Sequence, residues 1–250
     1  FEAPRLKDMA ERLSAVAPAS ALPEEVVPLR LGGTRRTLFF LHEPTGEVLS
    51  YERLSRHLGE DLPIYGLRAS RADAATQRDL VALARRHRDA IRQVQPQGPY
   101  RLAGWSGGGL LAYEIAHQLL AEDEAVEFIG LIDSARPGYK PAEPIPDELG
   151  MRWVFLEVYA AYLDPSLDML AIRALQEHMD LEQAVAHCRE LGWLPDSFRL
   201  DELVWRSARF GRLVHACMDY RPPPLPMPLH LFTGEPVPGS DPSMGWEALA

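Results

Sequence analysis

Short apolar runs alternate with amphipathic segments from Val26 onward. The runs VVPLRL, TLFFLH, PIYGLRA, YRLAG and FIGLID are predicted to be strands, and SYERLSRHL, LVALARRHRDAIRQVQ and GLLAYEIAHQLL are predicted to be helices. Because the strands are almost continuously apolar and helices separate them, they predict a mostly parallel sheet with helices on both faces. The predicted fold class is therefore α/β.

The alternation stops between Pro137 and Pro222. The patterns there are helical only: MRWVFLEVYAAYL, DMLAIRALQEHM, LEQAVAHCREL and DELVWRSARFGRLVHACM; the strand LHLFTG follows at 229–234. This block is several times longer than a crossover between parallel strands needs, so we expect an inserted helical lid rather than simple crossover packing. The apolar stripe of its first helix fits either the core of the block or the wall of an acyl-binding site: Trp153, Phe155, Leu156, Tyr159 and Leu163.

Composition removes several function classes. The net charge of −10 over 250 residues, without clustered Lys and Arg, argues against nucleic acid. No apolar run reaches the roughly 20 residues of a membrane helix, and the first residues do not resemble a signal peptide, so a cytoplasmic location is expected. The two cysteines, Cys188 and Cys217, form no metal-type cluster and are expected to be buried thiols.

One motif carries the chemistry. Gly104-Trp105-Ser106-Gly107-Gly108 fits G-x-S-x-G, and it lies between the strand YRLAG and the helix GLLAYEIAHQLL, as a nucleophile elbow requires. The pattern predicts Ser106 as the nucleophile of an α/β-hydrolase fold and the Gly107 N–H as a donor to the oxyanion. A P-loop and a dinucleotide fingerprint do not fit the glycines, and a zinc helix beginning at His42-Glu43 lacks its second histidine.

A serine nucleophile needs a base and an acid that orients it. Asp133, which ends the strand FIGLID, is one candidate acid, and Glu235, after the strand LHLFTG, is the other. No histidine after Asp133 is placed as the base, because each one lies in a predicted helix or strand: His178, His187, His215 and His230. We expect the base to follow Ala250.

The segments GPYRLAGWSGGGLLAYEIAHQLL and FIGLIDSARP resemble the thioesterase domains that end nonribosomal peptide synthetases and related polyketide synthases. The resemblance covers most of the chain from about Val26, more weakly in the lid. It favours Asp133 over Glu235, because the acid of this family follows the strand after the nucleophile helix. It also implies that the catalytic histidine follows DPSMGWEALA, so no residue of the chain takes that role.

The resemblance extends to domain organisation. Residues 1–15 are similar to the last helix of a carrier domain, with a linker at 16–25 and a thioesterase domain at 26–250 (lid about 137–222). In the stretch His42-Glu43-Pro44-Thr45-Gly46 the chain departs from the family, because Pro44 has no N–H at the place where a second oxyanion donor is usual. Either Thr45 supplies that donor or the loop is re-registered.

The implied activity is that of a serine thioesterase. It would release an acyl or peptidyl chain from the 4′-phosphopantetheine arm of an upstream carrier domain in the same polypeptide, through an acyl-Ser106 ester, by hydrolysis or macrocyclisation. No cofactor or metal bound to the domain itself is implied. The alternatives are a stand-alone editing thioesterase or esterase of the same fold and a catalytically silent binding domain.

Overall fold

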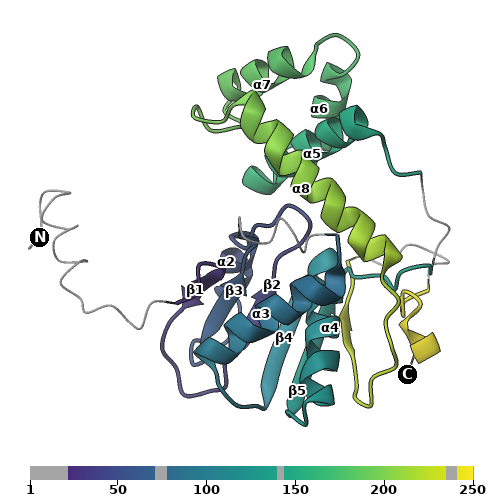
Figure 1. Cartoon of the computed structure of the whole chain (residues 1–250). Coiled ribbons are helices and arrows are strands. Elements are labelled where there is room, and N and C mark those ends of the chain that lie inside the picture. Colours follow the sequence, from purple (N-terminus) through teal and green to yellow (C-terminus); the bar gives the residue numbers. More distant parts are fainter. Residues whose placement is uncertain (1–21, 71–77, 140–143, 235–240, 250) are drawn as a thin grey trace, which may run out of the picture.

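Within the described residues, six strands form one sheet (Figure 1). The computed structural model describes residues 22–70, 78–139, 144–234 and 241–249. The strands are β1 (Val26–Arg30), β2 (Leu38–Leu41), β3 (Ile64–Leu67), β4 (Tyr100–Trp105), β5 (Val126–Ile132) and β6 (His230–Phe232). Their order is β1-β3-β2-β4-β5-β6, and every neighbouring pair is parallel except β1 with β3. The predicted mostly parallel sheet is confirmed.

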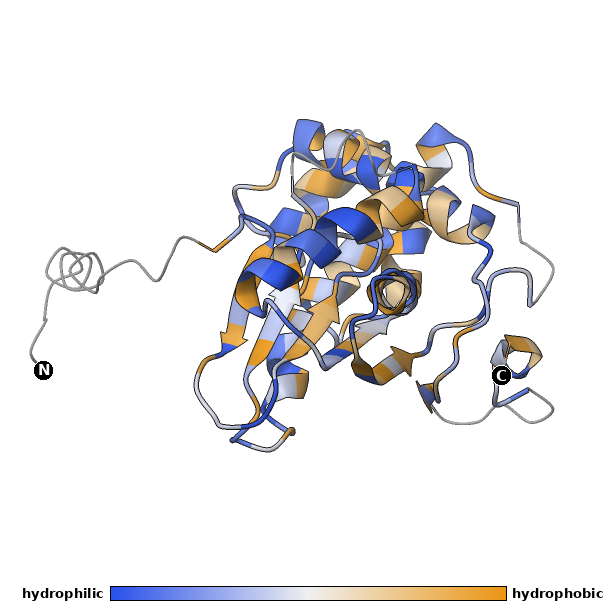
Figure 2. Ribbon diagram, turned by 60° about the horizontal axis from the view of Figure 1, so that its bottom comes forward, coloured by the Kyte–Doolittle hydropathy of each residue, from blue (hydrophilic) through white to orange (hydrophobic). Residues whose placement is uncertain are grey.

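Helices cover both faces of this sheet. They are α2 (Ser50–Ser55), α3 (Leu80–Val94) and α4 (Gly107–Ala121). α3 and α4 share a hydrophobic cluster with Leu102 and Leu131, whereas Tyr51 of α2 belongs to a separate cluster with Phe40 and Ala103, which alternate onto the other face. In Figure 2 the strands carry much hydrophobic colour, and the helices alternate between hydrophobic and hydrophilic colour along their length. The two-faced burial explains why the central strands are apolar throughout.

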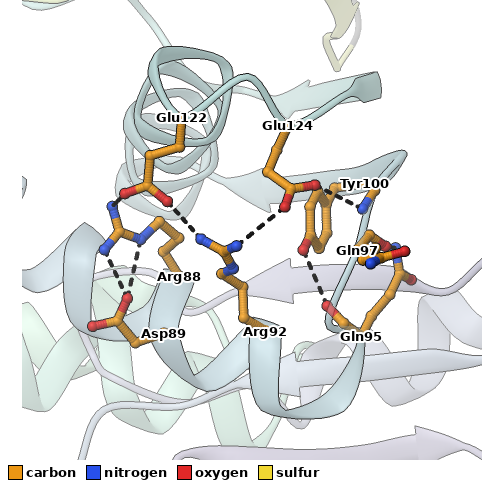
Figure 3. A network of polar contacts seen from close by, with 9 residues as sticks. Arg88, Asp89, Arg92, Gln95, Gln97, Tyr100, Glu122 and Glu124 are labelled. Atoms are coloured by element: carbon orange, nitrogen blue, oxygen red, sulfur yellow. Dashed lines mark hydrogen bonds and ion pairs between the residues drawn. The ribbon is translucent and has the colours of Figure 1, made fainter.

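A polar network ties α3 to the turn after α4 (Figure 3). Arg88 and Arg92 both donate to Glu122 at 2.5 Å, and Arg92 also reaches Glu124 at 3.1 Å. These arginines therefore have acidic partners in the fold. Because ion pairs near the surface contribute little stability each, the network adds only modestly to the stability of the fold.

The region between β5 and β6 contains four helices in its described part. They are α5 (Glu148–Leu163), α6 (Met169–Leu175), α7 (Leu181–Glu190) and α8 (Leu200–Asp219). α5, α6 and α7 each begin after an aspartate whose carboxylate accepts a backbone N–H of the first turn: Asp147, Asp168 and Asp180. α6 ends at Leu175, short of the expected 179, because the next residues make tighter i→i+3 hydrogen bonds.

This helical block has a hydrophobic cluster of its own. Phe155 and Leu156 are fully buried there, together with Ile172 of α6 and Val185 of α7. The apolar stripe of α5 is therefore core of the block. In Figure 1 the block lies beyond one end of the sheet, and α8 runs from it back to the sheet domain. Whether the block acts as a lid stays a prediction.

The last described segment, 241–249, packs back onto the sheet domain. It ends in the 3-10 turn η2 (Trp246–Leu249). Trp246 is buried, its ring lies 4.8 Å from that of Tyr113, and its Nε1–H donates to the Ser134 carbonyl at 2.7 Å. The segment thus fastens the loop that follows β5.

The carrier-like segment 1–15 and most of the linker 16–25 lie outside the described residues. None of the helices seen in the described parts of the chain is both long and apolar enough to span a membrane.

Candidate active site

Ser106 lies at the turn between β4 and α4. Its backbone adopts φ 53° and ψ −123°, a conformation that non-glycine residues rarely occupy. The turn is held by the Ser106 N–H, which donates to the Ile132 carbonyl at 2.9 Å, and by the Trp105 N–H, which donates to the Tyr51 hydroxyl at 2.8 Å. The strain is therefore imposed by the surrounding sheet, as a nucleophile elbow requires.

Two glycines let strand and helix approach each other at this turn. A Cβ on Gly104 would run into the backbone of Gly108, and a Cβ on Gly108 would run into the carbonyl of Leu41. Glycine at 104 and 108 is thus required by backbone packing.

Asp133 follows β5 as Ser106 follows β4. The residues before them, Trp105 and Ile132, are paired in the parallel ladder. Asp133 also has a positive φ of 44°, and its carboxylate accepts the Gly234 N–H at 2.9 Å. The competing acid, Glu235, lies outside the described residues.

Ser106 and Asp133 line one cavity of about 540 Å³. Its other walls come from the loop after β2, the loop after β5 and α8, including Pro44, Arg136, Tyr139, Val214, Cys217 and Met218. Gly107, also in this wall, is the first residue of α4, where helix N–H groups have no intrahelical partner. The structure thus brings three of the four predicted site residues together.

The fourth, Thr45, is placed differently. Its N–H donates to the Glu43 carboxylate at 2.8 Å, and its hydroxyl donates to the other oxygen of that carboxylate. Pro44 lies between this pair and the elbow, 3.1 Å from where a Cβ of Gly107 would be. In this geometry the Thr45 N–H is taken by Glu43, so a role for Thr45 as oxyanion donor requires the loop to rearrange.

Glu43 is a buried carboxyl group in the loop after β2. Burial raises its pKa to about 7, while its hydrogen bonds from Thr45 and the nearby Arg209 oppose the shift. Its carbonyl accepts the Gly46 N–H at 2.8 Å, which closes a tight turn over 43–46. The loop is therefore built around a carboxyl group that titrates near neutrality.

A buried histidine pair supports the same loop. The His42 Nδ1–H donates to the Glu43 carbonyl at 2.8 Å, and His42 Nε2 shares a hydrogen bond with His87 Nε2, 3.1 Å away. Burial, and then the neighbouring Arg86, lower the pKa of His87 to about 3. His87 is therefore neutral at neutral pH. No group of His, Cys, Asp and Glu in the described part of the chain is arranged to hold a metal ion.

No histidine is among the residues that line the Ser106 cavity in the described structure. His187 and His215 lie on α7 and α8, His178 lies in the turn after α6, and His230 in β6 stacks on Phe128 with ring centroids 4.8 Å apart. The identity and position of the base stay predictions.

The thiols do not compete with Ser106 as nucleophiles. Cys188 is buried in the helical block and Cys217 is partly buried beside Gly107. Burial raises the pKa of Cys188 to about 11 and that of Cys217 to about 12. Both therefore remain protonated at neutral pH.

Several residues that shape the site were not found by sequence reasoning. Tyr51 accepts from Trp105 and donates to the Leu41 carbonyl at 2.9 Å, which joins the ends of β2 and β4. Arg136 is held by the carbonyl of Gly245 at 2.7 Å. These contacts join segments distant in sequence, so no local pattern marks them.

Comparison with known proteins confirms the predicted resemblance. Residues 36–151 match the family model of the thioesterase domain. The chain is 36% identical over 150 residues to a dimodular nonribosomal peptide synthase of Bacillus subtilis, covering 59% of this chain and 6% of that protein. It is 33% identical over 135 residues to the atromentin synthetase nps3 of Serpula lacrymans, covering 52% of this chain and 14% of that protein. The chain thus spans a small part of these relatives.

Solved structures confirm the fold. The NocB thioesterase domain in covalent complex with a fluorophosphonate nocardicin G analogue superposes with a TM-score of 0.63 at 25% identity, covering 90% of this chain and 84% of that one. A four-domain nonribosomal peptide synthetase, AB3403, gives a TM-score of 0.78 at 24% identity over 97% of this chain and 19% of that one. The fold is that of thioesterase domains of the α/β-hydrolase type.

Proposed function

We propose that this thioesterase domain releases an acyl or peptidyl chain from a carrier-bound thioester through an ester on Ser106. The observation that carries the proposal is the strained Ser106 at the β4–α4 turn, which shares one cavity with Gly107 and Asp133. The matches to peptide and atromentin synthetases support a thioester on the phosphopantetheine arm of an upstream carrier domain as the substrate.

In the first step the Ser106 Oγ attacks the thioester carbonyl and its proton passes to a base. The Gly107 N–H, at the positive end of α4, stabilises the negative oxygen of the tetrahedral intermediate, a contribution worth about 3 kcal/mol for one donor. The carbon–sulfur bond then breaks, and the base returns its proton to the departing thiolate. The product of this step is the acyl ester of Ser106 and a free pantetheine thiol.

In the second step water or a nucleophile of the acyl chain attacks the ester. Water gives a free acid, and an internal nucleophile gives a macrocycle. Asp133 would orient the histidine that serves as the base. The carboxylate of Asp133 is steadied for this role by the Gly234 N–H.

The test is covalent labelling of the full-length natural protein with a fluorophosphonate, followed by peptide mapping. We expect the label on Ser106 of the wild type and none on Ser106→Ala. A panel of synthetic acyl thioesters, with products identified by mass, then separates hydrolysis from cyclisation. Absence of a label, together with absence of turnover, would favour the catalytically silent alternative, and turnover of free acyl thioesters without a carrier in the gene would favour an editing thioesterase.

A further inference from the structure

α8 contacts the loop after β2 at a single turn of the helix. The Arg209 guanidinium donates through Nη2 to the Thr45 carbonyl, and it lies 2.5 Å from where a Cβ of Gly46 would be. Arg209 is 6% exposed, so this is a buried contact between the helical block and the loop. The ring of Trp205, one helical turn earlier, covers the guanidinium with 5.0 Å from Cζ to the ring centroid.

The loop transmits this contact to the elbow. Thr45 is joined to Glu43 by two hydrogen bonds, and the residue between them, Pro44, packs against Gly107. The Gly107 backbone is the proposed oxyanion donor. Arg209, Thr45, Pro44 and Gly107 thus form one continuous series of contacts from α8 to the elbow.

We propose that Arg209 is a positioning residue that fixes the turn 43–46 against the elbow and makes the reactivity of Ser106 depend on where α8 lies. The inference rests on the proposed role of Ser106. It assigns Arg209 no contact with substrate, because the Ser106 cavity is lined on α8 by Val214, Cys217 and Met218.

Arg209 also has an electrostatic effect on Glu43, which can be measured separately from its packing. The guanidinium lowers the pKa of Glu43, against the larger effect of burial. Glu43 interacts electrostatically with groups of the loop, α2, α5 and α8. They are Glu47, Tyr51, Tyr162, Arg209 and Cys217. Of these, only Arg209 is a cation, so its removal raises the pKa of Glu43 further.

The experiment compares Arg209→Met with Arg206→Met in the full-length protein. Arg206 lies on the same helix and pairs with Glu47 and Glu202 at 2.6 and 2.7 Å, so its variant loses one partly buried cation without removing the contact to the Thr45 carbonyl. The measurements are the rate of fluorophosphonate labelling of Ser106 as a function of pH, kcat and KM for one acyl thioester, and thermal unfolding.

We expect Arg209→Met to slow labelling and lower kcat by about ten- to a hundredfold at an unchanged KM, and Arg206→Met to stay near wild type. The pH at which the labelling rate changes should be higher in Arg209→Met than in the wild type. The change in labelling rate that comes from the titration of Glu43 should be absent in Glu43→Gln. The double variant Glu43→Gln/Arg209→Met should lose less than the sum of the single effects, because both act through the same turn.

Equal effects of the two arginine variants, or an Arg209→Met protein that labels like wild type, would overturn the proposal. Should Arg209→Met fail to fold, Arg209→Lys keeps the charge while replacing the guanidinium, and it must still slow labelling without moving the pH profile upward. If the wild type itself does not label at Ser106, the proposed function fails instead, and the two failures are thereby distinguished.

Discussion

Ser106 donates its backbone N–H to the carbonyl of Ile132 at 2.9 Å, so the chain leaves β4 for the elbow while still bonded to β5. The next residue of β5 is Asp133, and both Ser106 and Asp133 have positive φ. The nucleophile and the candidate acid are therefore placed by one pair of adjacent parallel strands. Because both residues follow their strands, substitutions at Ser106 and Asp133 can test their roles without changing a residue of the sheet.

Ser106→Gly tests whether the elbow stores backbone strain. Glycine adopts φ 53°, ψ −123° easily, so we expect Ser106→Gly to unfold with a free energy about 1 kcal/mol higher than Ser106→Ala, which keeps a Cβ in the same conformation. Urea unfolding of both variants measures the difference, and neither should be labelled by a fluorophosphonate. Equal stability would show that the turn is unstrained.

Asp133→Asn should slow acylation of Ser106 by several orders of magnitude, because an amide cannot stabilise the imidazolium that forms on the base. The amide oxygen can still accept the Gly234 N–H, so the fold should persist. Glu235→Gln is the matched variant and should label at the wild-type rate. The reverse result would place the acid after β6.

Gly108→Ala should prevent folding or cost at least about 3 kcal/mol, because the new Cβ meets the backbone of β2, which cannot move without breaking the sheet. Gly234→Ala is the control, since a Cβ there meets nothing within 4 Å. Thermal unfolding monitored by circular dichroism reports both. A well-folded Gly108→Ala protein would contradict the close approach of helix and strand.

Glu43 should make stability pH-dependent. Its pKa is about 7 in the folded protein against an ordinary 4.5, so the folded state holds the proton more tightly. The free energy of unfolding should then fall as pH rises from about 4.5 to about 7, by up to about 3 kcal/mol, and stay lower above that range. In Glu43→Gln this loss should be absent, and in Glu47→Gln it should remain.

Urea unfolding of the three proteins between pH 5 and 8 gives the comparison. The stability of Glu43→Gln relative to wild type should increase with pH. A difference that does not change with pH would mean that Glu43 is ionised throughout.

Hydrogen exchange tests the predicted lid. The helical block has a hydrophobic cluster separate from that of the sheet, so α5–α7 should exchange as a unit of their own and faster than β2, β4 and β5. Acylating Ser106 should slow exchange in α8, which lines the cavity. Protection equal to that of the strands and unchanged by acylation would show that the block is fixed core rather than a gate.

The strands, the elbow and the position of Asp133 could be predicted because each is marked by a local pattern: apolar runs, G-x-S-x-G and an acidic residue ending a strand. The conformation of the loop after β2 could not be predicted from the sequence. Its geometry depends on Arg209, 164 residues from Thr45, and on His87, 45 residues from His42. The stripe of α5 was ambiguous for the same reason, since helical spacing does not say which neighbour it packs on.

The separate cluster of the helical block also bears on engineering. α5, α6 and α7 bury their apolar side chains mainly on one another and on α8, and none of them is among the described residues that line the Ser106 cavity, so this part could be exchanged for that of a thioesterase domain of similar fold without changing that wall. α8 could not be transferred together with α5–α7 without changes. It carries Arg209 and Cys217, which pack on the turn 43–46 and on Gly107. The productive crossover points for chimaeras therefore lie on either side of α5–α7, with α8 kept as native to the recipient.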